Sequence, residues 1–420
     1  MKNSRFALLR RLSAREIRLT VALLILLLLF FVFRHSHDFY DADDIARLYH
    51  WDADDNIRDV SNATLGFQEI FVLSFPTRLE RRDGIVLGAS LSELKIKLID
   101  GVNTTLIDEF HAAIPPEKEE DRLKDGVLGC WRGHMNAMQE IVRKNVSSVL
   151  ILEDDADWDV RIRQQLRDFA LSSRTLVQPW PGVASNTYPD PTFPEPDTEE
   201  RVQTASGSPG PFYLDQLPVT VRPSVSPYGD DWDILWLGHC GQGIPADMPD
   251  NERARHAPQG RVVHSDDATV PPPHGLYSFV QPFSVVDNYP RHTRVVHHSL
   301  GGTCTTAYAV SQRGARKILR DIANRPASRP IDLALQSWCD REKGHTTSPV
   351  CLTVNPTLFG SHMTAGPGGS RSVIHAASGG ADSGGEYRNE AKTDMIRMSV
   401  RLNADVILKK GTTYIDQMKD

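Results

Sequence analysis

The feature that most constrains the fold is a short apolar run that ends in a cluster of carboxylates. Residues 147–160 read SSVLILEDDADWDV. After the apolar run 149–152, four carboxylates fall within five positions: Glu153, Asp154, Asp155 and Asp157. Such a run is typical of a strand buried on both faces of a sheet, so the carboxylates follow directly where the strand ends. The same letters, D-A-D-D, at 41–44 and 52–55 follow no apolar run, and we interpret them as solvated.

The rest of the chain alternates between strand-like and helix-like segments. Apolar runs predict strands at 69–75, 94–101, 232–241, 301–311 and 348–359. Helices are predicted at 126–145, 160–171, 312–323 and 330–340, with a closing helix within 388–411. This alternation predicts an α/β fold of the Rossmann type, with a mostly parallel sheet flanked by helices. Because ligands of such sheets bind at the carboxyl ends of strands, the carboxylates mark a candidate site.

The N-terminal segment predicts a membrane anchor. Residues 19–33 carry no charge and follow a stretch rich in Arg. A helix of this length spans roughly 22 Å, short of the ~30 Å hydrocarbon core, but flanking Arg18 and Arg34 can snorkel. The basic side should stay cytoplasmic, which gives a cytoplasmic tail at 1–18, a transmembrane anchor at 19–33 and a type II orientation. A cleaved signal peptide is the alternative, although no small-x-small site follows the run.

The remaining residues are assigned to a stem and one large domain. The polar, acidic stretch 34–66 is interpreted as the stem, and 67–420 as a luminal domain. Within that domain, 176–230 is rich in Pro, Ser, Gly and Thr and is interpreted as a long mobile insertion. Other Pro-, Gly- or Ser-rich stretches occur at 242–274 and 364–388.

Charge and cysteine usage exclude some classes of protein. The chain has 47 basic and 54 acidic residues, whereas a nucleic-acid binder usually has a basic excess. The five cysteines show no C-x-x-C spacing, so a structural zinc site is not expected. Cys339 and Cys351 could form a disulfide in an oxidising compartment, the alternative being that all five are buried thiols. The odd number leaves at least one thiol without an intrachain partner. Sequons at Asn62, Asn103 and Asn145 agree with a luminal location.

The carboxylate cluster predicts a divalent cation. Carboxylates placed together repel unless a positive charge lies among them, and Mn²⁺ or Mg²⁺ prefers such oxygen ligands. Asp155 and Asp157 straddle Ala156, so an extended backbone points both to one side, and we assign them as metal ligands, with Asp154 as a close alternative for either position. Glu153 and Asp154 would bind ribose hydroxyls or orient the ligands. The cation would grip a diphosphate and neutralise it as a leaving group.

Several segments resemble glycosyltransferase family 25, the family of lipopolysaccharide and collagen galactosyltransferases. The resemblance rests on FVLSFPTRLERRD, GVLGCWRGH and ILEDDA, and WDILWLGHCG, TAYAVSQRGARKIL and PIDLAL follow in the same order. The long Pro-rich insertions are similar to those of fungal members. The resemblance implies a GT-A fold, a nucleotide-sugar donor that is often UDP-galactose, a Mn²⁺ ion and inversion at the anomeric carbon.

The resemblance also implies roles for individual residues. Arg78, Arg81 and Arg82 fall where the first loop would meet the nucleotide. Asp332 in PIDLAL is the expected general base, with Asp231 and Asp233 as alternatives. His362 follows the last strand, where many GT-A enzymes supply a further metal ligand. His134 could face the site, the alternative being a core histidine.

The function implied is that of a Golgi or ER hexosyltransferase, anchored in the membrane, that acts on a glycan or glycoprotein acceptor. The alternative is a catalytically silent GT-A-like protein that serves as a scaffold or chaperone in the secretory pathway. A third hypothesis, a metal-dependent phosphate hydrolase, is disfavoured because no second cluster with ligand spacing occurs in the sequence.

Overall fold

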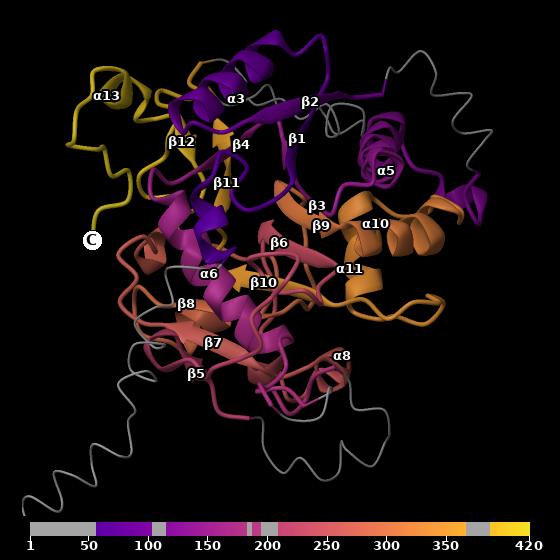
Figure 1. Ribbon diagram of the computed structural model, residues 1–420. Helices are drawn as coiled ribbons and strands as arrows, with labels where there is room; N and C mark the ends of the chain where they lie inside the picture. The colour runs from indigo at the N-terminus through magenta and orange to yellow at the C-terminus, as the bar shows by residue number, and fades with distance from the viewer. Residues whose placement is uncertain (1–55, 103–114, 183–186, 195–208, 367–386) are drawn as a thin grey trace, which may run out of the picture. The chain divides into compact units, whose positions relative to one another are not determined.

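The computed structural model describes residues 56–102, 115–182, 187–194, 209–366 and 387–420. In this part of the chain the strands form two sheets (Figure 1). The large sheet contains β1 (Glu69–Ser74), β2 (Ile96–Asp100), β3 (Ser148–Glu153), β5 (Phe212–Tyr213), β6 (Ile234–Gly238), β7 (Arg261–His264), β8 (Arg294–His298), β9 (Ala307–Ser311) and β10 (Cys351–Asn355). The small sheet contains β4 (Ala156–Trp158), β11 (Phe359–Met363) and β12 (Lys392–Thr393).

The large sheet is mixed, and its core is largely parallel, as predicted. Its order is β2-β1-β3-β9-β6-β10-β8-β7-β5. β2, β1 and β3 pair in parallel, as do β6 with β10 and β7 with β5. β9 runs antiparallel to both β3 and β6, and β8 antiparallel to both β10 and β7. The predicted α/β class is confirmed, and the strands β1 and β3 that end at the carboxylates do run side by side in the same direction.

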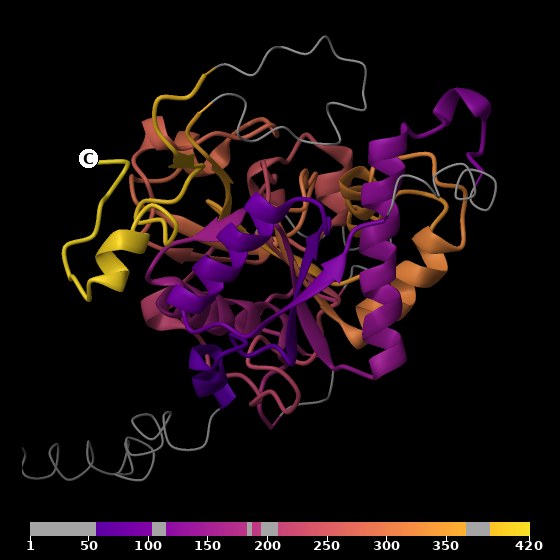
Figure 2. The same ribbon diagram turned by 90° about the horizontal axis from the view of Figure 1, so that it is seen from above.

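Helices cover both faces of the sheet. The helices of at least four residues are α3 (Leu79–Leu91), α5 (Asp125–Lys144), α6 (Ile162–Val177), α8 (Glu252–His256), α9 (Ser284–Asp287), α10 (Gln312–Ile318), α11 (Ile331–Cys339) and α13 (Ala404–Leu408). A π-helical turn, 319–323, extends α10. α5 contacts both α10 and α11, and Figures 1 and 2 show α5 on one side of β1 and β3 and α3 on the other. The layers are therefore helix, sheet and helix.

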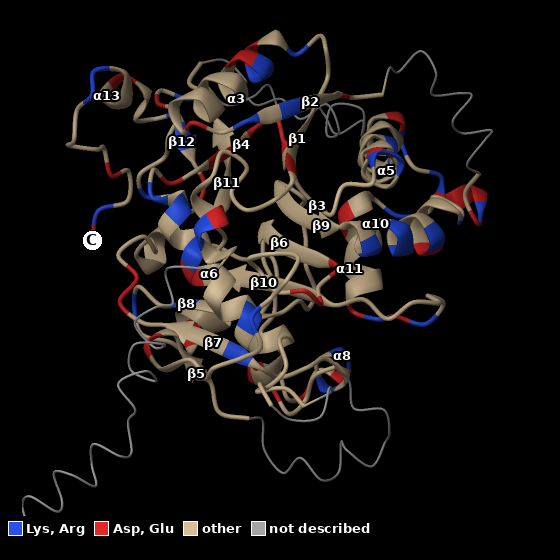
Figure 3. Cartoon of the chain, viewed as in Figure 1, with Lys and Arg blue, Asp and Glu red and all other residues tan. Residues whose placement is uncertain are grey.

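The alternation of side chains along β3 explains why its sequence is continuously apolar. Leu150 and Leu152 pack with α3 and α6 in one core cluster. Val149 and Ile151 pack with α5, α10 and α11 in the other. A strand covered on both faces buries every side chain, so it lacks the polar alternation of a half-exposed strand. Figure 3 shows the same effect in β6, β9 and β10, which carry no charged residue.

The folded unit begins earlier than the sequence suggested. It extends from Asn56 to Asp420, whereas the stem was expected to reach residue 66. The turn 56–61 is a 3-10 helix whose Ile57 and Val60 are buried, and Leu65 is fully buried beside them. These three apolar side chains join the core cluster that contains α6. The boundary was misplaced because they are spaced among acidic and polar residues, which hides their apolar face.

Two other expectations need correction. Parts of the predicted mobile insertion 176–230 belong to the core, since α6 continues to Val177 and both Asp190 and Tyr228 are fully buried. The closing helix expected within 388–411 is reduced to α13 and the short strand β12. This segment instead supplies hydroxyl and amide groups to the site, as described below, so local helix propensity is overridden by long-range hydrogen bonds.

Two disulfides lie in the described part of the chain. Cys339–Cys351 confirms the pairing that their closeness in sequence suggested, and Cys240–Cys304 joins residues 64 positions apart. Cys130 is a free thiol. Persistent disulfides are typical of proteins that fold in an oxidising compartment. The predicted tail and anchor, 1–33, lie outside the described residues, and none of the described helices combines the length and apolar character needed to cross a membrane.

Candidate active site

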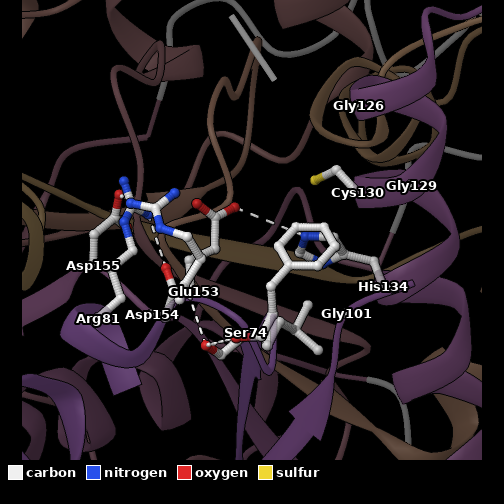
Figure 4. Close-up of a pocket in the computed structure, with 14 residues that line it drawn as sticks. Ser74, Arg81, Gly101, Gly126, Gly129, Cys130, His134, Glu153, Asp154 and Asp155 are labelled. Atoms are coloured by element: carbon white, nitrogen blue, oxygen red, sulfur yellow. Dashed lines mark hydrogen bonds and ion pairs between the residues drawn. The ribbon is translucent and has the colours of Figure 1, made fainter. Parts of the chain in front are cut away.

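The three consecutive carboxylates Glu153, Asp154 and Asp155 lie where β3 leaves the sheet, beside a cavity of about 120 Å³ (Figure 4). The cavity is bounded by the ends of β1 and β3 and by one face of α5. Ser74, the last residue of β1, donates from Oγ to Asp154 Oδ2 at 2.8 Å. This contact follows from the parallel register, because Leu73 is the partner of Glu153 and the two strands end together.

Arg81 supplies the positive charge that the sequence analysis assigned to a cation. From the first turns of α3, its Nη1 lies 2.8 Å from Asp154 Oδ1 and 3.1 Å from Asp155 Oδ2. The Arg81 side chain is only 16% exposed, so this ion pair is partly desolvated. A buried charge needs a partner of this kind, and one guanidinium here serves two carboxylates.

Arg401 adds a second positive charge from the C-terminal segment. Its Nη2 donates to the backbone carbonyls of Asp154 and Ala156, both at 2.9 Å. It reaches them across a glycine of α3, because a Cβ on Gly84 would lie 2.9 Å from Arg401 Nη1. Arg401 therefore fixes the backbone of the carboxylate turn, and its charge partly offsets that of Asp155 and Asp157.

Asp155 and Asp157, the predicted metal ligands, have no hydrogen-bond partner in common. Asp155 pairs with Arg81, and its other oxygen, Oδ1, is buried without a hydrogen-bond partner among the described residues. Asp157 is fully buried and accepts hydrogen bonds from Thr393 Oγ1 at 2.7 Å, from the Trp158 backbone at 2.8 Å and from the Ser399 hydroxyl. Asp155 thus keeps an acceptor for a ligand, whereas Asp157 ties β4 to the C-terminal segment.

Glu153 lies between the carboxylate turn and α5. Its Oε1 accepts from Thr305 Oγ1 at 2.7 Å and lies 3.8 Å from His134 Nε2 (Figure 4). Burial, and after it the charge of Asp155, raises the pKa of Glu153 to about 8. The side chain is nevertheless 31% exposed, since it opens toward the cavity. Glu153 is therefore suited to hydrogen bonding with a hydroxyl group, the role predicted for it.

His134 is a buried histidine, and only its Nδ1 has a hydrogen-bond partner among the described residues. It is 1% exposed, and Nδ1 lies 2.7 Å from the Tyr308 hydroxyl. Burial raises the pKa of Tyr308 and lowers that of His134 to about 3, so the phenol keeps its proton and the imidazole is neutral. Either the Tyr308 hydroxyl donates to Nδ1 or Nδ1–H donates to the Tyr308 oxygen, because a neutral imidazole can carry its one proton on either nitrogen. Both interpretations offered by the sequence apply, since His134 is in the core and also faces the site.

Arg78 and Arg82 flank the same loop. Arg78 lines the cavity and its Nε donates to Glu80 at 2.5 Å. Arg82 donates to the carbonyls of Phe75 at 3.1 Å and Ser74 at 3.0 Å and pairs with Asp100. Arg82 thereby joins the ends of β1 and β2. The nucleotide-binding roles of all three arginines stay predictions. Arg78 and Arg81 line the cavity, whereas Arg82 donates to the backbone carbonyls of Ser74 and Phe75, two residues that line it.

Asp332, the predicted general base, lies in the first turn of α11. Its Oδ2 accepts from the Cys304 backbone at 3.1 Å and its Oδ1 from the Leu333 backbone at 2.9 Å. It is near enough to Glu153 for its charge to contribute to the raised pKa of Glu153. The loop that carries Cys304 thus connects Asp332 with Glu153. The catalytic role of Asp332 stays a prediction, and its two backbone partners also suit a helix-capping role.

The alternative bases, Asp231 and Asp233, lie at the opposite end of the strands from the carboxylates. They precede β6, so they are at its amino end rather than its carboxyl end. Asp233 is fully buried and pairs with Arg313 at 2.9 Å and Lys317 at 2.7 Å. Asp231 pairs with Arg313 as well. These contacts indicate that the pair anchors α10 to the sheet.

The residues present fit a cation at Asp155. Its Oδ1 is an orphaned acceptor, and the His362 backbone N–H donates to the Asp155 backbone carbonyl at 2.8 Å. His362 Nδ1 lies 3.0 Å from Thr393 Oγ1 and 3.6 Å from Asp157 Oδ2. No group of three or more His, Cys, Asp or Glu with metal-ligand geometry occurs among the described residues. One or two carboxylates are, however, the usual protein ligands of Mg²⁺ at phosphate sites, where the substrate supplies other oxygens.

Several residues of the site come from distant segments and were not expected from the sequence. They are Ser74, Thr305, Tyr308, Thr393, Ser399 and Arg401. Ser74 ends a predicted strand parallel to β3, so its place could have been foreseen from the sheet. The residues from 393 to 401 carried no local signal.

Comparison with known proteins places this geometry in a family context. Residues 67–178 match Glycosyltransferase family 25 (LPS biosynthesis protein). Procollagen galactosyltransferase 2 of Mus musculus is 23% identical over 111 residues, covering 24% of this chain and 18% of the relative. Inactive glycosyltransferase 25 family member 3 of Homo sapiens is 29% identical over 113 residues, covering 24% and 19%. The match thus spans about a fifth of the length of these curated relatives.

The matched segment contains most of the site. It begins just before β1 and ends after α6, so it includes Arg81, His134 and the carboxylates, but not Asp332 or the segment around Arg401. The relatives include proteins named as transferases and proteins named as inactive. Residues 67–178 of this chain are thus similar to glycosyltransferase family 25.

Proposed function

We propose that this protein is a glycosyltransferase that moves a hexose, with galactose the first candidate, from a nucleotide sugar to a glycan or glycoprotein acceptor. The observation that carries the proposal is the cavity at the carboxyl ends of β1 and β3, which is lined by Glu153, Asp154, Asp155 and Arg81 within the segment that matches the family. Ligand sites of α/β sheets lie at this edge.

Each of the residues at the cavity has a separate proposed role in binding the donor. Asp155, with His362 beside it, would hold Mn²⁺ or Mg²⁺, which when bound neutralises the diphosphate. Arg78 and Arg81 line the cavity and offer guanidinium groups to phosphate oxygens. Glu153 faces the cavity and would accept hydrogen bonds from donor hydroxyl groups. Asp332 is the proposed base that takes the proton of the acceptor hydroxyl, which would give inversion.

A donor screen tests the proposal most directly. Thermal-shift measurements of the purified chain with Mn²⁺ and a panel of nucleotide sugars should show stabilisation by one class of donor, since a ligand that binds only the folded state raises Tm. Asp155→Asn should remove the Mn²⁺-dependent part of this shift. Asp100→Asn is the matched control, because Asp100 lies on the neighbouring strand end and pairs with Arg82 rather than with the cluster. Equal shifts for wild type and Asp155→Asn would count against a cation at this position.

A catalytically silent scaffold is the second candidate, and a specific contact favours it. Arg81 pairs with both Asp154 and Asp155 and so offsets part of their charge. If that ion pair is permanent, neither Mn²⁺ nor a nucleotide sugar should change Tm, and Arg81→Gln should only destabilise the fold. If Arg81 yields to a cation, Arg81→Gln should tighten Mn²⁺ binding measured without nucleotide, since the competing charge is gone. Calorimetric titration with Mn²⁺ alone distinguishes these outcomes.

We further propose that the protein works in the lumen of the Golgi or ER as a type II membrane protein. The two disulfides support an oxidising compartment, and the uncharged run 19–33 after a basic tail supports the anchor. Extraction of membranes at high pH should leave the protein in the membrane fraction. Release into the soluble fraction would contradict the anchor.

A further inference from the structure

The loop 299–306, between β8 and β9, holds the side chain of Glu153. Thr305 Oγ1 donates to Glu153 Oε1 at 2.7 Å. Two residues of this loop have left-handed backbone conformations, Gly301 with a φ of 67° and Cys304 with a φ of 61°. This conformation is unfavourable for a residue that carries a side chain, so the backbone at Cys304 needs support from its surroundings.

Both left-handed residues are held by carboxylates of α11. Asp332, in the first turn of the helix, accepts from the Cys304 backbone N–H at 3.1 Å. Asp340, the residue directly after the helix, accepts from the Gly301 backbone N–H, which lies 2.9 Å from Oδ1 and 3.2 Å from Oδ2. One helix therefore fixes the loop at both of its left-handed residues.

The stability of α11 does not account for Asp340. A carboxylate at the C-terminal end of a helix is unfavourable because it meets the negative end of the helix dipole. The Asp340 side chain is also 0% exposed, and burial of a carboxylate is costly. Its ion pair with Arg253, at 2.9 Å, involves a side chain that is 44% exposed. The other contact that Asp340 gains in return for its burial is the hydrogen bond to the loop.

We propose that Asp340 is a positioning residue that acts through the loop 299–306 on Glu153, and that neutralising its charge loosens the loop. The inference rests on the proposed function, in which Glu153 binds donor hydroxyl groups and Asp332 takes the acceptor proton. A charged acceptor forms a stronger hydrogen bond than a neutral one, so a protonated Asp340 would hold Gly301 less firmly. Burial raises the pKa of Asp340 to about 6, so the charge is lost in mildly acidic solution.

Other charged and titratable groups surround Asp340, and they come from α8, β8 and the segment after α11. They are Arg253, His256, His298, Arg341 and Glu342. Arg253 favours the charged form of Asp340, and Glu342 opposes it. Histidine side chains can also change charge near pH 6. Comparison of wild type with Asp340→Asn therefore isolates the proton of Asp340 from those of its neighbours.

Trp236 reports the state of the loop without any ligand. Its Nε1 donates to the Cys304 carbonyl at 2.9 Å, so the ¹H–¹⁵N resonance of this indole depends on the position of the loop. The resonance is assigned by its absence in Trp236→Phe. In wild type it should shift between about pH 5 and pH 7.5 with a midpoint near 6, whereas in Asp340→Asn it should stay near the low-pH position of wild type. A resonance that titrates in the same way in both proteins overturns the inference.

Calorimetric titration with UDP and Mn²⁺ measures the consequence for the site. At about pH 7.5, Asp340→Ala should weaken UDP binding about ten-fold and Asp340→Asn about three-fold, because Asn keeps a neutral acceptor for Gly301. At about pH 5, wild type and Asp340→Asn should bind UDP equally, and the titration of UDP itself cancels in this comparison. If Asp340→Ala does not fold, the pH comparison with Asp340→Asn carries the test.

Asp321→Ala is the matched control. The Asp321 side chain is also 0% exposed and accepts from two backbone N–H groups, those of Thr346 and Thr347. These residues lie outside the lining of the cavity. Asp321→Ala should therefore lower Tm, as Asp340→Ala does, but it should bind UDP like wild type.

The outcomes distinguish failure of the two proposals. If wild type binds UDP but the Asp340 variants bind it equally well, or if Asp321→Ala weakens it as much as Asp340→Ala does, the positioning role alone is overturned. If wild type does not bind UDP, the proposed function fails and the positioning role fails with it. Selective weakening by the Asp340 variants, with loss of the pH response of Trp236 in Asp340→Asn, supports the inference.

Discussion

Asp157 offers the sharpest test of which carboxylates bind ligands and which hold the fold together. The sequence pairs it with Asp155 as a metal ligand, but the structure gives it no exposed surface and supplies protein donors to both of its oxygens. Oδ1 accepts from the Trp158 backbone, and Oδ2 accepts from the hydroxyls of Thr393 and Ser399. We therefore expect Asp157→Ala to be a stability mutation.

The expected decrease in the free energy of unfolding follows from the hydrogen bonds that Asp157→Ala removes. A hydrogen bond to a charged group contributes about 1.5–3 kcal/mol, and a buried donor left without a partner adds a penalty of similar size. The losses are not additive here, because Thr393 Oγ1 already lies 3.2 Å from Ser399 Oγ and the two hydroxyls can pair with each other. We expect Asp157→Ala to lower the free energy of unfolding by about 3–5 kcal/mol. Asp157→Asn keeps the shape and one acceptor and should cost about 1–2 kcal/mol.

Thermal denaturation and hydrogen exchange together measure this effect. For a domain of this size, about 4 kcal/mol corresponds to a fall in Tm of roughly 5 °C, since the unfolding entropy grows with chain length. Amide exchange should accelerate first in 392–401, because Asp157 attaches that segment to β4. Asp155→Asn is the matched comparison, and it should change Tm by less than the Asp157 variants because its partner Arg81 is partly exposed.

One result would refute this assignment. If Asp157→Asn left Tm and hydrogen exchange unchanged but removed Mn²⁺-dependent binding of a nucleotide, Asp157 would be a metal ligand, as the spacing of the sequence indicates. The hydroxyls of Thr393 and Ser399 would then be turned away when a cation is bound.

Separate features of the chain give three further predictions. Removing the Cys240–Cys304 disulfide, which closes a 64-residue loop, should lower the free energy of unfolding by roughly 4 kcal/mol by the chain-entropy relation. Because the loop after Cys304 contacts Glu153, this change should also weaken nucleotide binding measured by calorimetry. Loss of the Cys339–Cys351 disulfide should lower Tm without changing nucleotide binding. The raised pKa of Glu153 means that the folded state holds its proton more tightly than the unfolded chain, so its contribution to stability is full below pH 4.5 and is lost as pH rises through about 8. Tm measured against pH should therefore fall less steeply in Glu153→Gln over that window, and parallel curves would contradict the shift. Asn62 and Asn145 are exposed within their sequons, so protein made in a secretory host should lose mass on enzymatic deglycosylation. Asn62→Gln and Asn145→Gln should each reduce this loss of mass by one glycan. An unchanged mass would contradict luminal exposure of these sites.

The strands could be predicted because the sheet buries both of their faces. β1, β6 and β10 lie inside the runs expected from the sequence, β3 extends the run 149–152 by one residue at each end, and each of these strands is mostly apolar. Their pairing could not be read in the same way. β9 inserts between β3 and β6 in the antiparallel direction, and an apolar run carries no information about the direction of its neighbours.

The site could be predicted in position but not in composition. The carboxyl end of β3 followed from the apolar run and the general location of ligands in α/β sheets. The partners of Asp157, by contrast, lie 236 and 242 positions away, in a segment without strand or helix periodicity. Hydrogen bonds of this range depend on how β4, β11 and β12 assemble, and each of these strands is at most five residues long. Such short strands leave little pattern in a sequence.

Clustered carboxylates do need a positive charge among them, as expected, but the sequence did not identify where that charge comes from. Arg81 pairs with Asp154 and Asp155, and Arg401 holds the backbone beneath them. The acidic turn is therefore held by two arginines of the protein itself, with Asp155 Oδ1 still lacking a partner among the described residues. A cation that binds there must compete with a guanidinium only for the other oxygen of Asp155. This arrangement makes cation binding conditional on the ligand that brings phosphate oxygens with it, because those oxygens supply both the remaining metal ligands and a new partner for Arg81.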